Sequence, residues 1–172
     1  MLRTGTAPER RAATEALVAE GTSELRLIDL ADDPDPDFAA VVIYTLGFFS
    51  TDSAFARVRD ALADERLEVR IAAAGALGKS RHDGASLPLL ARLAGLDLPR
   101  DDHELDEILI ALRGLADPRS EPALAKVLAS QRAHERSHPR SGSHGDLAAE
   151  ALEALGTTTA RAASTAWRDR AG

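Results

Sequence analysis

Apolar residues recur at intervals of three and four along much of the chain, which is the spacing of helices that bury one face. In residues 85–94, for example, the series is Leu87, Leu90 and Leu93. The same spacing returns in segments about 30 to 40 residues apart. The pattern predicts a first set of amphipathic helices, over residues 23–31, 53–63, 85–94 and 121–129.

An internal repeat predicts a second set of helices that alternates with the first. Three segments place an apolar residue nine positions before a Leu-Gly pair, with mostly small or aliphatic residues between. The apolar residues are Phe38, Val69 and Leu147, and the glycines are Gly47, Gly78 and Gly156. A fourth copy runs over residues 105–114 by the same spacing, or else ends at Leu115-Ala116 with its register shifted by two. Both alignments remain open.

Helix breakers and caps separate the two sets. Asp33-Pro34-Asp35-Pro36 and Asp117-Pro118 interrupt helices, and the repeat-ending glycines suit left-handed C-caps. Pro8 is suited to a first helical position, so a further helix is expected over residues 8–21. The expected organisation is one domain, 1–172. Its repeats span roughly 23–49, 52–79, 84–116 and 119–156, with a polar insertion at 132–143 and a tail at 157–172.

Stacking is what allows such helix pairs to form a core, because no single pair can bury its apolar face alone. Hydrophobic residues make up 44% of the chain but aromatic residues only 3%, a mixture that favours closely packed helices over sheets. The predicted fold is therefore all-α: a right-handed α-solenoid of about four helix pairs with an N-terminal capping helix.

Residues 64–80, DERLEVRIAAAGALGKS, resemble the second helix of a HEAT repeat, and more specifically the short bacterial kind associated with bilin-lyase-like proteins. Asp117-Pro118-Arg119 and Ala123-Leu124 resemble the turn and first helix of a further copy. The resemblance extends over residues 23–156. It implies a non-enzymatic protein-binding scaffold without a cofactor. The 31 residues from Phe38 to Val69 fit only the short variety, and the later intervals of 36 and 42 imply insertions.

Charge and composition narrow the class of partner. The net charge of −7 disfavours nucleic acid and anionic membranes, whereas a basic protein segment would be attracted. The chain has no cysteine, and its longest apolar run, residues 38–44, is far shorter than the roughly 20 residues that span a bilayer. We therefore expect a cytoplasmic protein without a targeting segment, and leave its oligomeric state open.

The resemblance also implies that the second helices line a concave binding surface. Tyr44 is then either a partner anchor or a core tyrosine with a solvated hydroxyl. Phe48, Phe49 and Phe55 surround one turn and are expected in the core, with one of the adjacent pair partly exposed. Arg70 is implied to be structural, holding an aspartate of a neighbouring turn, Asp33 or Asp64. The outward positions expected to contact a partner are Tyr44, Glu68, Glu107, Arg113, Glu150 and Glu153.

One motif points to different chemistry. His134-Glu135-Arg136-Ser137-His138 matches the H-E-x-x-H signature of zinc hydrolases, and His144 lies where one protease family places its third ligand. The polar neighbours and Pro139 argue against a buried zinc helix, so we expect a loop without metal. A metal-dependent hydrolase using His134, His138 and His144 stays an alternative. So does bilin-lyase-like chromophore handling, for which no residue marks a pocket. Trp167 is expected to cover the last helix or to contact a partner.

Overall fold

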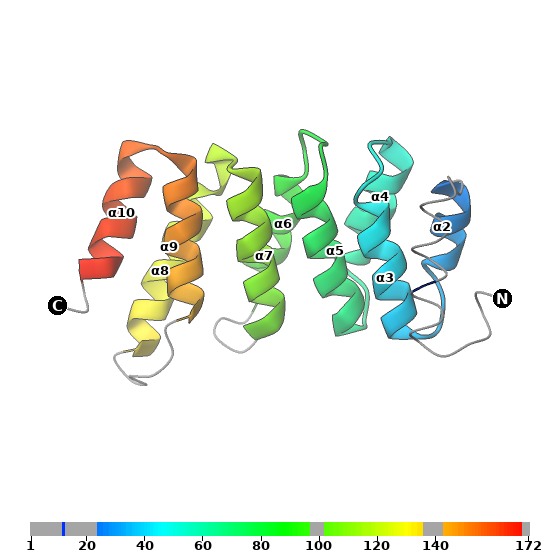
Figure 1. The fold of residues 1–172 in the computed structure, drawn as a ribbon. Coiled ribbons are helices and arrows are strands. Elements are labelled where there is room, and N and C mark those ends of the chain that lie inside the picture. Colours follow the sequence, from blue (N-terminus) through cyan, green and yellow to red (C-terminus); the bar gives the residue numbers. More distant parts are fainter. Residues whose placement is uncertain (1–11, 13–23, 97–101, 136–142, 170–172) are drawn as a thin grey trace. The chain divides into compact units, whose positions relative to one another are not determined.

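The computed structural model describes residues 24–96, 102–135 and 143–169, together with Ala12. Within these ranges the chain is helical and contains no strand, which confirms the all-α prediction (Figure 1). The helix expected over residues 8–21 lies outside them. None of the described helices is long and apolar enough to cross a membrane.

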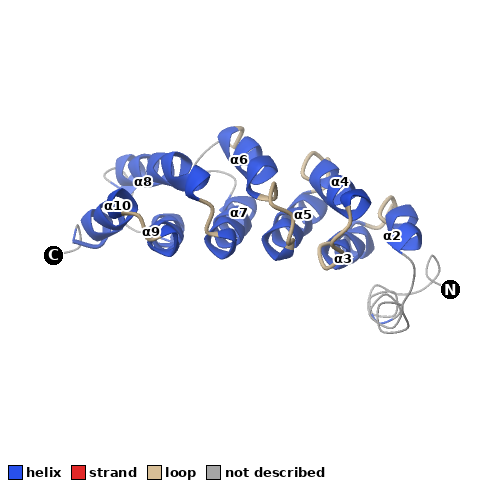
Figure 2. Cartoon of the chain, turned by 90° about the horizontal axis from the view of Figure 1, so that it is seen from above, coloured by secondary structure: helices blue, strands red, loops and turns tan. Residues whose placement is uncertain are grey.

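The chain divides into two compact units, residues 1–82 and 83–172. In the first unit α3 and α5 pack side by side as a layer, and α4 covers one side of that layer (Figure 2). This is the predicted alternation of first and second helices, and it is consistent with an α-solenoid. The helices of this unit are α2 (Glu24–Leu30), α3 (Pro36–Leu46), α4 (Asp52–Ala61) and α5 (Leu67–Lys79).

The local sequence of α3 explains where it begins and what it buries. The carboxylate of Asp35 accepts hydrogen bonds from the N–H groups of Asp37 and Phe38, and Pro36 occupies the first helical position. Phe38, Ile43 and Leu46 are then almost completely buried, as is Val69 on α5. The repeat-defining apolar residues of this unit thus form its core.

Gly47 ends α3 for a different reason from the one predicted. Its φ is −61°, so it is not a left-handed cap. A Cβ at this position would lie 2.7 Å from both the Cα and the carbonyl oxygen of Ala76 on α5. Glycine is therefore required for the close approach of the two helices. Gly78 also differs from the prediction, since it lies inside α5, whereas Gly156 is left-handed with φ +71°.

In the second unit α7 packs against α9, and α9 also packs against α8 and α10 (Figures 1 and 2). The fully buried residues include Leu105, Ile108, Leu112 and Leu124. The elements are α6 (Ser86–Ala94), α7 (Asp102–Leu115), the 3-10 turn η1 (Pro118–Ser120), α8 (Glu121–Glu135), α9 (Ser143–Leu155) and α10 (Thr158–Arg168).

The backbone settles the register of the third repeat. Ala116 has φ +48° and Gly156 has φ +71°, and each is followed by an N-cap residue, Asp117 or Thr157. The Leu115-Ala116 pair therefore corresponds to Leu155-Gly156, 40 residues later. The shifted alignment is the right one, with alanine accepting a conformation that glycine adopts more readily.

Two segments carry more helix than predicted. The expected insertion at 132–143 is helical up to Glu135, and helical again from Ser143. The expected tail contains α10, which Thr157 caps and which buries Ala160, Ser164 and Trp167. These residues recur at four and three, a helical spacing, but only Trp167 among them is large and apolar. The weak apolar signal explains why the sequence did not reveal the helix.

Trp167 closes the second unit at the end of α10. It is fully buried, and its Nε1–H donates to Asp146 Oδ1 at 2.8 Å. A Cβ on Gly145 would lie only 1.8 Å from Cζ2 of the indole. The indole therefore packs closely against the backbone at the start of α9, and so joins α10, the last helix of this unit, to α9.

Candidate functional site

An exposed aromatic pair lies at the C-terminal end of α3, with Tyr44 in its last turn and Phe48 in the turn that follows the helix. Tyr44 is 38% exposed and Phe48, one helical turn later, is 61% exposed. Their ring centroids lie 5.6 Å apart with the planes at 78°, an edge-to-face contact. The opposite side of α3 is buried in the unit core. The structure thus places Tyr44 at the surface, partly covered and in edge-to-face contact with Phe48.

The remaining phenylalanines of this region lie deeper. Phe49 and Phe55 are only partly exposed, and Phe55 stacks on His82 with ring centroids 3.8 Å apart. Three of the four phenylalanines and the only tyrosine of the chain therefore lie within residues 44–55. Sequence reasoning expected one residue of the Phe48-Phe49 pair to be partly exposed but did not say which, and the structure shows that Phe48 is the more exposed one. Its position four residues after Tyr44 and beyond the last buried turn of α3 was the signal that it is exposed.

Glu68 adds negative charge to the surface of the first unit. It is exposed in the first turn of α5, and Asp37 is exposed in the first turn of α3. The two residues lie 31 positions apart and occupy the same place in successive repeats. This unit therefore presents an aromatic pair at the end of α3 and one carboxylate at the start of each second helix.

The candidate residues of the second unit are largely paired with one another or with arginine. Arg113 on α7 forms a salt bridge with Glu150 on α9. Glu153 pairs with Arg168 on α10 at 2.6 Å and accepts a hydrogen bond from Ser164. Glu107 is partly exposed on α7. The negative potential of this unit is consequently smaller than the sequence suggested, because two of the three glutamates carry a neighbouring cation.

Arg70 holds a turn through the main chain. Its Nη1 donates to the carbonyl oxygens of Asp64 and Glu65, both at 2.9 Å. The carboxylate of Asp64 instead accepts hydrogen bonds from the guanidinium of Arg66. The contact expected between Arg70 and a neighbouring turn thus involves carbonyl groups rather than the carboxylate.

Asp64 and Arg66 form the polar centre of this turn. Asp64 Oδ1 accepts the Arg66 N–H at 2.9 Å, and both carboxylate oxygens accept from the guanidinium at 2.8 Å. Arg66 also donates to the carbonyl of Asp33 in the preceding turn at 2.7 Å. The hydrogen bonds from Arg66 hold the pKa of Asp64 down, at about 2.

Asp117 and Arg119 repeat this arrangement in the second unit. Asp117 accepts the Arg119 N–H and the guanidinium, and Arg119 Nη2 reaches the carbonyl of Asp83 at 3.1 Å. The guanidinium of Arg119, followed by the hydroxyl of Ser86, lowers the pKa of Asp117. Each arginine therefore ties its own turn to an earlier one, which makes these residues structural.

Asp64→Asn is expected to cost about 1 kcal/mol of unfolding free energy near pH 7 and almost nothing near pH 2. Asparagine keeps an acceptor for the Arg66 N–H but loses the charge. Because folding lowers the pKa of Asp64, its contribution is present above its unfolded pKa and is lost as the pH falls from about 4 to about 2. Urea denaturation of both proteins across this range measures the difference.

Asp60→Asn is the matched control, since Asp60 pairs with Arg59 on the open surface and both side chains are at least half exposed. It should change stability little at any pH. A cost of Asp64→Asn that stayed constant down to pH 2 would contradict the assignment, because a protonated Asp64 could no longer supply it.

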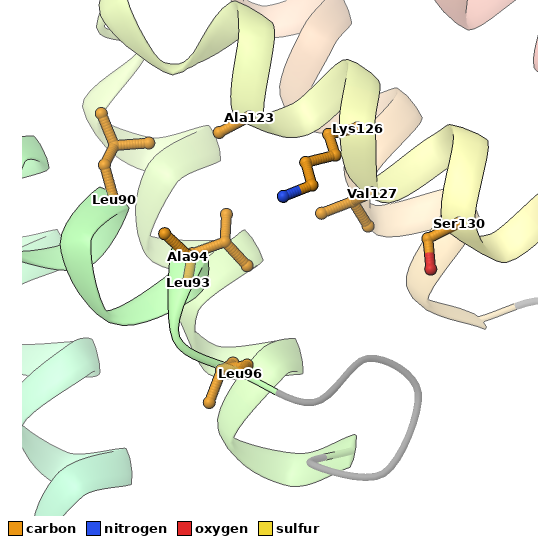
Figure 3. A pocket seen from close by; sticks show the side chains of 8 residues that line it. All are labelled: Leu90, Leu93, Ala94, Leu96, Ala123, Lys126, Val127 and Ser130. Atoms are coloured by element: carbon orange, nitrogen blue, oxygen red, sulfur yellow. The ribbon is translucent and has the colours of Figure 1, made fainter.

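An apolar groove lies between α6 and α8 in the second unit (Figure 3). Its volume is about 320 Å³, and it is open to solvent on one side. The side-chain amine of Lys126 extends into it from α8 (Figure 3). Sequence reasoning missed this groove, because it depends on the separation of two helices. The described residues that line it are Leu90, Leu93, Ala94, Leu96, Ala123, Lys126, Val127 and Ser130.

The histidine motif stays untested as a metal site, because among its candidate ligands only the side chain of His144 belongs to the part of the chain that the structure describes. No group of three or more histidine, cysteine or acidic residues there could hold a metal ion. His144 is buried near the start of α9, where its Nε2 lies 3.3 Å from Asp106 Oδ1 on α7. His138, and the side chains of His134 and Glu135, lie outside the description.

Comparison with known proteins agrees with the stacked helix pairs. A search of curated proteins gave no match. HEAT repeats generally serve as protein-interaction scaffolds, and the family is typically non-enzymatic. Residues 24–104, from α2 into the first turn of α7, match the family model of HEAT repeats.

Proposed function

We propose that this chain is a non-enzymatic adaptor that binds another protein through the solvent-exposed face of its second helices, which the resemblance implies to be concave. The Tyr44–Phe48 pair at the end of α3 carries the proposal. Two large aromatic side chains are exposed at the surface of a chain with few aromatic residues. They lie in the last turn of α3 and just after it, and the other side of this helix is buried in the core. Tyrosine is enriched at binding hot spots because it buries a large area at small entropic cost.

The rigidity of the support strengthens the case. Phe38, Ile43 and Leu46 anchor α3 in the core, and Gly47 allows close contact with α5. A surface held in this way loses little conformational freedom on association. The aromatic pair is thus prepared to accept a partner without reorganisation of the backbone.

The partner is proposed to carry a basic segment. Asp37 and Glu68 are exposed at the starts of α3 and α5, and the chain as a whole carries a charge of −7. Opposite charge on the partner would accelerate and orient the encounter. The second unit contributes less, since Arg113 pairs with Glu150 and Arg168 with Glu153. Glu107, which is partly exposed on α7, is proposed as a further contact.

Two finer assignments belong to the same proposal. The 31-residue spacing of Phe38 and Val69 supports the short bacterial variety of repeat that resembles bilin-lyase-like proteins. The absence of cysteine supports a cytoplasmic location. Neither assignment alters the binding surface proposed above.

The double variant Tyr44→Ala, Phe48→Ala is expected to weaken partner binding by about tenfold or more, because it removes the anchor of the surface. The partner is first identified by placing a photo-crosslinking amino acid at position 48 and analysing the products from native lysate by mass spectrometry. The affinity of the purified partner is then measured by calorimetry for the wild type, the double variant and Glu68→Lys. We expect the charge reversal to weaken a basic partner several-fold.

Leu25→Ala is the matched control for loss of exposed apolar area, since Leu25 is 69% exposed on α2 of the same unit. It should leave the affinity unchanged, and circular dichroism should show all variants folded. An affinity that is equal for the wild type and the double variant would refute this surface as the binding site.

A further inference from the structure

We propose that the groove between α6 and α8 is a second protein-docking site, and that it accepts a segment in which an aliphatic side chain stands beside a carboxylate. The groove belongs to different helices and a different unit from the Tyr44–Phe48 pair, so this inference is independent of the function proposed above. Its occupant is argued from the lining of the groove, its charge and its form.

The apolar lining of the groove favours an apolar side chain on the docked segment. Leu93 and Val127 are almost fully buried, whereas Leu90 is only partly buried and Ala94 is exposed. Six of the eight described lining residues are apolar. An apolar side chain entering from the open side would remove this surface from water, which favours binding in proportion to the area buried.

Lys126 favours a negative charge on the docked segment. None of the described residues that line the groove is acidic, and within the described chain Lys126 has no hydrogen bond or ion pair. It is one of only two lysines in a chain with 28 acidic residues. An ammonium group beside apolar surface favours a partner carboxylate, because the pair would form in a partly desolvated place.

The form of the groove favours a protein segment over a small amphiphile. Small-ligand sites enclose most of the ligand surface and occupy about 300–1,000 Å³. This groove is at the lower end of that range and only partly enclosed. The lining runs from Leu90 to Leu96, along the last turn of α6 and just beyond its end, and from Ala123 to Ser130 along about two turns of α8. That length matches anchors at successive turns of a docked segment.

The test is a selection of random peptides of about 12 residues, displayed on phage, against the full-length protein. We expect the selected sequences to place Asp or Glu within one helical turn of Leu, Ile or Met. A synthetic peptide of the consensus should bind Lys126→Glu about tenfold more weakly than the wild type, and Lys126→Met a few-fold more weakly. Reselection on Lys126→Glu should replace the acidic position by a basic one.

Lys79→Glu is the matched control, because it makes the same charge change at the other lysine, which is exposed at the end of α5. It should leave the peptide affinity unchanged. Ala94→Trp fills the groove from an exposed position and should abolish binding while circular dichroism stays unchanged. Tyr44→Ala, Phe48→Ala should have no effect, which separates this site from the first.

The proposal would be overturned if the selection yielded no peptide, or only peptides without an acidic position. It would also be overturned if Lys126→Glu and Lys79→Glu changed the affinity of the peptide equally. Unchanged binding of the peptide to Ala94→Trp would have the same meaning. Binding of decanoate without any peptide would assign the groove to small amphiphiles instead. A change of sedimentation on Lys126→Glu would assign it to a second copy of the chain.

Discussion

Replacing Trp167 with alanine should lower the free energy of unfolding of the second unit by about 3–5 kcal/mol. The indole is fully buried over the start of α9, and its removal opens a cavity and leaves Asp146 without the Nε1–H donor. Because Trp167 is the only tryptophan, urea denaturation should be followed by circular dichroism, which reports both variants equally.

Gly145 provides the internal control for this packing. Gly145→Ala alone should be strongly destabilising, since its Cβ would meet Cζ2 of Trp167 at 1.8 Å. In the Trp167→Ala background the same change should be nearly neutral, because the clash is gone. Equal costs of Gly145→Ala in both backgrounds would show that the indole does not pack on this helix.

Arg92→Met should destabilise the second unit by about 3 kcal/mol. Arg92 Nε lies 2.5 Å from Glu104 Oε1 and Nη2 lies 3.0 Å from Oε2, while Glu104 is only 1% exposed. Methionine keeps most of the apolar stem of Arg92 but removes the charge that compensates the buried carboxylate. The helix dipoles stabilise both charges further, because Arg92 is in the last turn of α6, where a cation is favoured, and Glu104 is in the first turn of α7, where an anion is favoured.

The double variant Arg92→Met, Glu104→Gln should recover much of this loss, because it removes the buried charge together with its partner. Denaturation of the wild type, both single variants and the double variant gives the coupling between the two residues. Additive costs would mean that the two side chains do not stabilise the fold as a pair.

The sequence alone determined the succession of helices. The apolar spacing, as around Leu90, and the Leu-Gly ends predicted where most of the helices lie. Each helix buries one face, so its apolar residues recur at intervals of three and four. The same reasoning failed for α10, where Ala160 and Ser164 are too small to mark a buried face, and Trp167 alone did not reveal a helix.

Candidate residues were found where exposure follows from position within one helix. Tyr44 and Glu68 could be placed on outward positions by counting residues. Which of the candidate glutamates form salt bridges could not be found in this way. The salt bridges from Arg113 to Glu150 and from Arg168 to Glu153 join different helices. Only the packing of α7, α9 and α10 showed that these carboxylates lie beside cations.

Tertiary structure also decided what individual residues do. Gly47 was predicted as a left-handed cap from its place at the end of a helix, but its conformation is right-handed, and glycine is needed there so that α3 can approach Ala76. The groove beside Lys126 likewise exists only because α6 and α8 are spaced apart. Helical periodicity is a property of one segment and can be read from it, whereas clearances and charge pairs depend on distances between segments that no local pattern encodes.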